Sequence, residues 1–193
     1  MNIEIIKADY LNEQHEKEIL MLLDEYASDP MGGGQPLNEN VKNNLVKELS
    51  KLSHAFSIIA YVDGQPAGLV NCFEAFSTFS CKPLINIHDV VVLNEYRGNA
   101  ISQKMLDKVE EIAKTKGCCK VTLEVLSNNE VAKSAYSKFG FSGYELDPKA
   151  GAALFWQKNT KNHITISSSG HPKLRGFKLK GHILNCFFEK YWK

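Results

Sequence analysis

Apolar residues along this chain follow two periods, one typical of amphipathic helices and one typical of strands. Helical spacing is clear over residues 13–26, before a glycine-rich stop, and over residues 100–116, which Gly117 closes. Two β-branched and aromatic segments flank Asp63 and Gly64, which predicts a hairpin with a two-residue turn. We therefore expect helices over 13–26, 38–52, 100–116 and 129–139, strands at the start and over 55–62, 65–74, 85–92, 119–126 and 152–158, and loops over 76–83 and 93–99.

The order of these elements, β-α-α-β-β-β-α-β-α-β, predicts an α/β (α+β) fold. We expect a mixed, mostly antiparallel central sheet with helices on both faces. The 85–92 segment ends in a nearly continuous apolar run, which indicates a strand buried on both faces. A length of 193 residues fits one domain with a well-buried core.

The net charge of +1 hides two parts of opposite sign. Residues 159–193 carry +6, and residues 1–158 carry −5. We therefore expect a domain over 1–158 and a basic C-terminal extension over 159–193 of unknown role. The charges of the extension are spaced and form no binding motif, so we expect no nucleic-acid partner. Its aromatic end can pack on the domain or on a second subunit, which leaves a homodimer open.

Composition also bears on location and on metals. No apolar run approaches the length of a membrane span, and the first residues do not resemble a signal peptide, so we expect a cytoplasmic protein with no membrane partner. The five cysteines include no CxxC pair and no histidine at zinc-ligand spacing. We therefore expect reduced, mostly buried thiols and no metal.

The stretch VVVLNEYRGNAIS places a polar turn between a buried strand and a helix. The start of a helix presents unpaired N–H groups and the positive end of the helix dipole, and small residues let an anion approach that backbone. Residues 97–102 therefore predict an anion-binding turn, although such turns also cap helices for structural reasons.

At these residues the chain resembles the GNAT superfamily of acyl-CoA-dependent N-acyltransferases. The cofactor motif of that family is Arg/Gln-x-x-Gly-x-Gly/Ala, and here Arg97 is followed by Ala100 and Ser102 at the two small positions. A later family motif, Asn-x-x-Ala-x-x-x-Tyr-x-x-x-Gly-Phe, is matched in full from Asn129 to Phe141. The two motifs and the element order cover about residues 1–158, and the resemblance implies the GNAT fold, with a β-bulge or splay of the sheet at the acyl-CoA site.

The resemblance implies acetyl-CoA as co-substrate and assigns its contacts. The strand edge at Val90, Val91 and Val92 would pair with the pantetheine arm, and one N–H there would polarise the thioester carbonyl. Asn129 would bond the pantetheine arm, and Tyr136 would protonate the departing thiolate as general acid. The pyrophosphate would lie on the turn formed by Arg97, Gly98, Asn99, Ala100, Ile101 and Ser102.

His88 is the candidate general base. Several family members carry a glutamate at the position of Asn86, which cannot take a proton. Alternation along a strand places Asn86, His88 and Val90 on one face and Asp89 on the other. Imidazole titrates near neutral pH, so we expect His88 to deprotonate the amine directly or through water. A core histidine with water as proton acceptor is the alternative, and Asp89 either orients His88 or supports the sheet.

Substrate selection in this family falls to the loop between the first two helices and to the edge of the third strand. The residues there predict an acidic, partly apolar pocket for a cationic amine: Tyr26, Asp29, Gly33, Glu74 and Phe76. Three consecutive glycines in this loop, Gly32, Gly33 and Gly34, suit a mobile lid or a close approach of the backbone to a ligand. A plain flexible connector is the alternative.

The expected function is transfer of acetyl from acetyl-CoA to a primary amine of a small molecule, by direct attack in a ternary complex. Two alternatives stay open. A peptide or protein N-acetyltransferase needs a long open groove, and a non-catalytic acyl-CoA-binding module is favoured if Ala100, Ser102 and Asn86 mark a decayed site.

Overall fold

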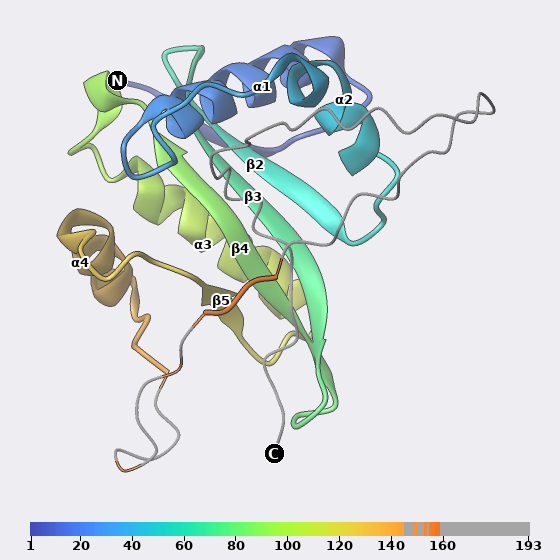
Figure 1. Ribbon diagram of the computed structural model, residues 1–193, viewed down its shortest axis with the longest axis vertical. Coiled ribbons are helices and arrows are strands. Elements are labelled where there is room, and N and C mark those ends of the chain that lie inside the picture. Colours follow the sequence, from blue (N-terminus) through green and yellow to red (C-terminus); the bar gives the residue numbers. More distant parts are fainter. Residues whose placement is uncertain (145–148, 150–152, 154, 159–193) are drawn as a thin grey trace, which may run out of the picture. The chain divides into compact units, whose positions relative to one another are not determined.

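The computed structural model describes residues 1–144, 149, 153 and 155–158 (Figure 1). Met1–Ser142 form one compact unit, which holds every helix and strand of the described residues. The strands are β1 (Ile3–Lys7), β2 (Ala55–Val62), β3 (Gln65–Ser77), β4 (Lys82–Val92) and β5 (Val121–Leu123). The helices are α1 (Glu13–Ser28), α2 (Glu39–Leu49), α3 (Ile101–Thr115) and α4 (Glu130–Phe139), with a short 3₁₀ helix over Asn94–Tyr96.

The strands form one five-stranded sheet in the order β1-β2-β3-β4-β5. The first four pair antiparallel with their neighbours, whereas β5 pairs parallel to β4. The predicted α/β fold with a mixed, mostly antiparallel sheet is therefore confirmed.

Helices cover both faces of this sheet (Figure 1). One buried cluster joins α3 to the sheet through Ile101, Met105 and Leu106, which pack with Ile58 of β2. On the opposite face, α1 and α2 pack against the next residue of β2, Ile59. Consecutive strand residues thus serve opposite helical layers, as the two-residue period of a strand requires. We call the two faces the α3 side and the α1 side.

Helix ends agree with the chemistry of their sequences. Asn12, Asn38 and Asn129 cap α1, α2 and α4 by accepting hydrogen bonds from backbone N–H groups of the first turn. Between β2 and β3, Asp63 and Gly64 both have positive φ, at 49° and 81°. This is the backbone of the tight hairpin turn that the sequence predicts.

Three predicted elements differ from the structure. Half of the expected loop at 76–83 is strand, because backbone pairing continues to Ser77 opposite Lys82, and only residues 78–81 form the turn. The strand expected over 119–126 is β5, which is limited to Val121–Leu123 because it pairs with only three residues of β4. Within the strand expected over 152–158, the described residues are exposed and have no strand assignment.

The domain boundary expected at residue 158 stays a prediction, since the compact unit ends at Ser142 and the basic extension lies outside the described residues.

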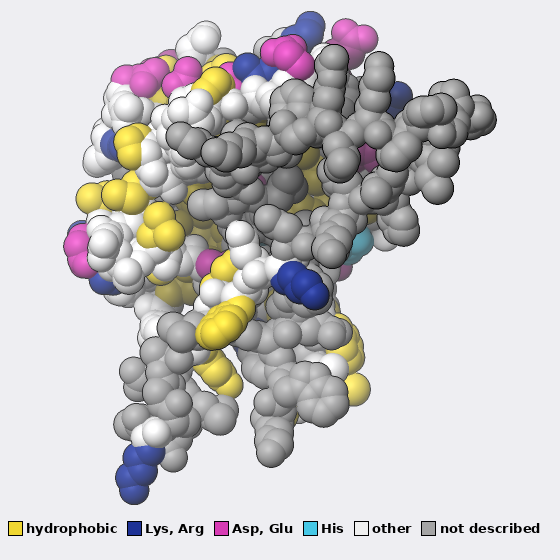
Figure 2. All heavy atoms as spheres, viewed as in Figure 1, with side chains coloured by type: hydrophobic (Ala, Val, Ile, Leu, Met, Phe, Trp, Pro, Cys, Tyr) yellow, Lys and Arg dark blue, Asp and Glu magenta, His cyan; other side chains and the backbone are white. Residues whose placement is uncertain are grey.

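Acidic side chains gather along the edge of the molecule where α1 lies (Figure 2). Of the cysteines that the structure describes, Cys72 is buried and Cys118 half-buried, but Cys81 and Cys119 are exposed, so the expectation of mostly buried thiols holds for half of them. None of the described helices combines the length and the apolar character that a bilayer crossing requires.

Gly68 sets the distance between β3 and α3. A Cβ at this position would lie 2.9 Å from the Val91 backbone oxygen and 2.9 Å from Met105 Cε. Replacing Gly68 by Ala should lower the free energy of unfolding by about 1–3 kcal/mol, because the backbone of β4 has to shift. Urea denaturation measures the change. Gly143→Ala is the control, since a Cβ there meets nothing within 4 Å, and equal stabilities of the two variants would contradict the prediction.

Candidate active site

One extra residue in β4 distorts the middle of the sheet. Asn71 of β3 lies opposite Asp89, and the next residue, Cys72, lies opposite Ile87, so His88 is inserted without a partner position on β3. This is a β-bulge, which re-aims neighbouring side chains and is frequent beside active sites. The β-bulge that the resemblance implies is therefore present, and it falls at His88.

Side chains of β4 exchange faces at the bulge. Ile87 belongs to the cluster on the α3 side, and Val90, three residues later, packs against the same cluster. Val91 belongs to the cluster on the α1 side. A regular strand would place residues 87 and 90 on opposite faces. The inserted residue thus inverts the alternation for the rest of the strand.

His88 and Asp89 both lie on the α1 side as a result. Asp89 Oδ2 accepts a hydrogen bond of 3.0 Å from Asn71 Nδ2. The His88 ring meets Phe73 edge to face, with centroids 5.5 Å apart. The prediction that grouped His88 with Val90 and placed Asp89 on the opposite face is wrong, because alternation was counted through the bulge. Asp89 is a site residue that the sequence analysis left undecided.

Burial governs the acid–base groups around the bulge. It raises the pKa of Asp89, although the hydrogen bond from Asn71 and the neighbouring His88 act in the opposite direction. It also raises the pKa of Tyr26 on α1, and the negative charge of Asp89 adds to that effect. Burial raises the pKa of Tyr136 on α4 to about 12, with a further contribution from Tyr26. Elements far apart in sequence thus bring these groups into electrostatic reach of one another.

Beyond the bulge, β4 offers a strand edge. β5 pairs only with Ile85–Ile87 of β4, and the pairing stops at Ile87 opposite Leu123. Among the described residues no strand pairs with Val90, Val91 and Val92 on that edge, although β3 pairs with them on the other. Backbone groups at such an edge can bond an extended ligand, as a β-strand would. The edge therefore fits the pantetheine arm that the resemblance assigns to it.

The turn over residues 97–102 presents its backbone to solvent. Gly98 and Ala100 have φ of 83° and 58°, and α3 begins without a side-chain cap. Asn99 Nδ2 donates to the Tyr96 carbonyl at 3.1 Å, and Ile101 is buried in the core. The first N–H groups of α3 have no carbonyl partner inside the helix, so the turn suits an anionic group such as pyrophosphate.

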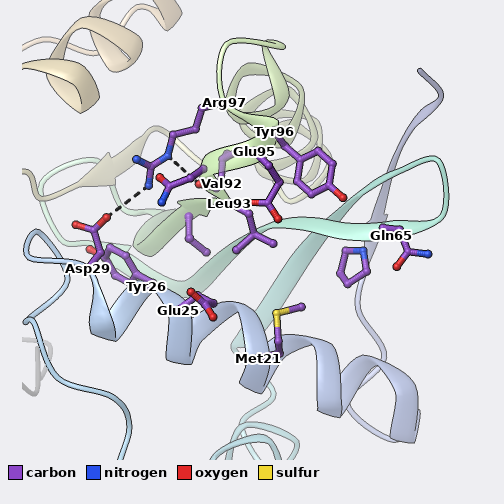
Figure 3. A pocket seen from close by; sticks show the side chains of 13 residues that line it. Met21, Glu25, Tyr26, Asp29, Gln65, Val92, Leu93, Glu95, Tyr96 and Arg97 are labelled. Atoms are coloured by element: carbon purple, nitrogen blue, oxygen red, sulfur yellow. Dashed lines mark hydrogen bonds and ion pairs between the residues drawn. The ribbon is translucent and has the colours of Figure 1, made fainter.

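A pocket of about 400 Å³ lies between α1 and the segment that leads from β4 into α3 (Figure 3). Arg97 Nε donates to the Val92 carbonyl at 3.0 Å, and its Nη2 lies 3.6 Å from Asp29 Oδ2. The lining includes two predicted substrate residues and three predicted cofactor residues: Tyr26, Asp29, Val91, Val92 and Arg97. The structure thus brings part of each predicted set to one surface, whereas the two predicted catalytic residues, His88 and Tyr136, do not line this pocket.

The glycine-rich loop after α1 is well bonded rather than open. The Asp29 carbonyl accepts the N–H groups of Gly32, Gly33 and Gly34 at 2.8, 3.1 and 3.0 Å, and its Oδ1 accepts the Met31 N–H at 2.8 Å. A Cβ on Gly32 would lie 1.8 Å from the Tyr26 carbonyl oxygen, so only glycine fits there. Asp29 therefore organises the loop, and Gly33 is an exposed member of it.

α4 carries the other predicted catalytic residue. Asn129 Oδ1 caps the helix by accepting the Ala132 N–H at 3.1 Å, which leaves its Nδ2 amide group as the donor for a ligand. Tyr136 packs partly buried against the α3-side cluster. Gln103 Nε2 of α3 donates to the Ala135 carbonyl at 2.9 Å and so fixes the turn beside Tyr136. Sequence reasoning missed Gln103, because a polar residue in the first turn of a helix gives no signal of a contact with a later helix.

Glu74 and Phe76, two of the predicted substrate residues, do not line the pocket. Glu74 pairs with Lys116 at 2.6 Å, at the end of α3. Phe76 lies toward the β3–β4 hairpin tip with 59% of its surface exposed. Neither residue lines the pocket that holds Tyr26 and Asp29. The described residues also contain no cluster of three or more His, Cys, Asp or Glu side chains able to hold a metal ion.

Comparison with known proteins identifies the family. The acetyltransferase (GNAT) family model matches residues 19–141. The thialysine N-epsilon-acetyltransferase of Bos taurus is 41% identical over 56 residues, which are 29% of this chain and 33% of that protein. The chain thus matches about a third of the length of the first curated relatives.

Solved structures agree at the level of the fold. A crystal structure of a probable acetyltransferase has a TM-score of 0.69 at 19% identity and covers 82% of this chain and 99% of its own. An aminoglycoside N-acetyltransferase in complex with CoA has a TM-score of 0.65 at 16% identity, with coverages of 82% and 96%. Because the family model spans well over half of the chain, the protein belongs to the acetyltransferase (GNAT) family, a family of acyltransferases.

Ala100 tests the anion-binding turn. Its left-handed backbone costs an L-residue roughly 1–2 kcal/mol, and a β-branched residue more. Replacing Ala100 by Val should distort the start of α3 and weaken CoA binding about tenfold, whereas Ala100→Gly should bind CoA at least as tightly as the parent. Isothermal titration with CoA measures both, with urea unfolding as the check on folding. Equal affinity of the Val variant and the parent would exclude the turn from the binding site.

Proposed function

We propose that the protein transfers an acetyl group from acetyl-CoA to a primary amine of a small molecule, by direct attack in a ternary complex. The observation that carries the proposal is the edge of β4 at Val90–Val92. No strand of the described residues pairs with this edge, and it is followed by the start of α3, which has no side-chain cap. The family supplies the donor, since GNAT acetyltransferases use acetyl-CoA. The pyrophosphate would bond the turn over residues 97–102, and the pantetheine arm would pair with the edge of β4.

The proposed reaction needs one group that accepts a proton and one that donates a proton, and the site offers a candidate for each. The amine nitrogen attacks the thioester carbonyl carbon, and His88, inserted on the α1 side, accepts the proton that the nitrogen loses. The carbon–sulfur bond then breaks, and the thiolate takes a proton from Tyr136. A pKa of about 12 keeps the Tyr136 phenol protonated at neutral pH, so it is present as a donor.

Direct attack is favoured over an acyl-cysteine intermediate by the state of Cys72. This residue lies opposite Ile87 in the sheet, beside the bulge. Burial raises the pKa of its thiol far above the ordinary value, and the charge of Asp89 adds to this effect. A thiol held protonated is a poor nucleophile, so the acetyl group has no cysteine to occupy at this point of the sheet.

A small cationic acceptor is supported by the pocket. Its volume of about 400 Å³ is in the range of small-molecule sites, and three carboxylates line it, those of Glu25, Asp29 and Glu95. The described acidic surface along α1 would attract a cation toward this region (Figure 2). The names of the similar proteins described above specify thialysine and an aminoglycoside, which agrees in kind with this proposal.

An amine panel tests the function directly. The protein is mixed with acetyl-CoA and thialysine, lysine, a polyamine, an aminoglycoside or a peptide with a free N-terminus, and release of the CoA thiol is followed. We expect turnover with at least one small amine and none with the peptide. Turnover with the peptide alone would replace the small-molecule proposal, and CoA binding without any turnover would support a binding module instead.

His88 is tested by a substitution that removes its basicity. Replacing His88 by Gln should lower kcat by about 10²-fold, because general-base catalysis contributes at least that much, and should change the acid limb of the pH–rate profile. Affinity for acetyl-CoA should stay within about twofold. His54→Gln is the matched control, since His54 contacts the same Phe73 ring but lies just before β2 and not at the bulge of β4. An unchanged pH profile in the His88 variant would remove His88 from the mechanism.

A further inference from the structure

A row of polar side chains crosses the α1 side of the sheet and ends at the bulge. Ser57 of β2 lies directly opposite Asn71 of β3, which lies directly opposite Asp89 of β4. Tyr10, from the segment between β1 and α1, extends the row by one member. The hydrogen bonds measure 2.8 Å from Tyr10 to Ser57, 2.7 Å from Ser57 to Asn71 and 3.0 Å from Asn71 to Asp89.

The row is buried where it crosses the sheet. Ser57 is fully buried and Asn71 is 4% exposed, on a face that otherwise carries apolar residues such as Ile59 and Leu69. A buried polar group is costly unless it is hydrogen-bonded. Among the described residues every buried side-chain nitrogen and oxygen has a partner. The sheet therefore holds a satisfied polar row at a place where apolar side chains would stabilise the fold more simply.

The hydrogen bonds of the row have one direction. Asn71 uses its Nδ2 amide group toward Asp89 and its Oδ1 toward Ser57. Ser57 has a single hydroxyl proton, which it donates to Asn71 Oδ1, so Ser57 Oγ has to accept from the Tyr10 hydroxyl. Each donor thus points along the row toward Asp89. This arrangement matches a charged Asp89 carboxylate, which can only accept.

We propose that Asn71 is a positioning residue for the reaction, which holds Asp89 as a carboxylate beside His88, and that Ser57 and Tyr10 fix the orientation of the Asn71 amide. The carboxylate stabilises the imidazolium that forms when His88 takes the proton of the amine. A protonated Asp89 would instead favour a turned amide, with Oδ1 toward Asp89 and every hydrogen bond of the row reversed. The role of His88 in this inference rests on the proposed function.

The ionisation of Asp89 depends on the groups around its carboxylate, and the Asn71 hydrogen bond is one of them. The titratable groups that interact with the carboxylate are His88 on its own strand, Tyr26 from α1 and Cys72 from β3. Burial opposes its ionisation, and the Asn71 hydrogen bond is the larger of the two effects that favour ionisation. Removing the Asn71 amide should therefore raise the pKa of Asp89.

The experiment follows the carboxyl carbon of Asp89 by ¹³C NMR during a pH titration, with the signal assigned by its loss in Asp89→Asn. Asn71→Leu should move the midpoint to higher pH by about one pH unit, and Ser57→Ala should move it by less in the same direction. Val70→Ala is the matched control, because Val70 is buried on β3 next to Asn71 but belongs to the α3-side cluster. It should lower the melting temperature without moving the midpoint.

If Asn71→Leu does not fold, Ser57→Ala decides the test alone. A midpoint in either folded variant that equals that of the Val70→Ala control would overturn the proposal. The acid limb of the kcat profile, measured with an amine accepted in the panel, should differ between Asn71→Leu and the Val70→Ala control, which a merely structural role of Asn71 would not produce. If no amine is accepted, the proposed function fails while the titration still decides the role of the row.

Discussion

The insertion of His88 into β4 is the constraint on which the site depends. If β4 alternated regularly through His88, Asp89 would share a face with Ile87 and enter the apolar cluster under α3, where an unpaired carboxylate costs several kcal/mol. With the bulge, His88 and Asp89 occupy adjacent positions on the α1 side, and Asp89 lies within electrostatic reach of Tyr26. The bulge therefore lets β4 present two consecutive acid–base groups on the α1 side while Ile87 and Val90 still pack on the α3 side.

The same strand serves the other half of the proposed reaction. β5 leaves β4 at Ile87, one residue before the bulge, so the free edge and the re-aimed side chains begin at the same point. The rest of the site is built around this point by separate anchors. Asp29 fixes the loop after α1, and Gln103 fixes α4 next to Tyr136. Each anchor is a hydrogen bond to backbone, which holds a position without filling the space that a ligand needs.

Much of the fold could be predicted from sequence, because the spacing of apolar residues and the residues that form turns or end helices are local signals. The hairpin at Asp63-Gly64 and the helix closed by Gly117 depend only on neighbouring residues, and the structure has both. The resemblance carried by Arg97 and the Asn129–Phe141 motif likewise named the family correctly. Strand ends were predicted less well, since the limits of β5 depend on a partner strand far away in sequence.

The interior of the site could not be predicted in the same way. A bulge is defined by register between two strands, so the sequence around His88 reads as regular alternation and misplaces Asp89. The row from Tyr10 to Asp89 joins four segments, and no single segment shows it. Glu74 was expected at the substrate pocket from its position on the third strand, but its carboxylate pairs with Lys116 instead.

The most direct test of the central claim is amide hydrogen exchange along β4 with and without acetyl-CoA. If the free edge beyond the bulge binds the acyl-CoA, exchange in residues 90–92 slows on binding, while residues 82–87, already paired on both sides or at the hairpin, keep their rates. Slowed exchange that spares residues 90–92, under conditions where acetyl-CoA binding is measured independently, would contradict the claim.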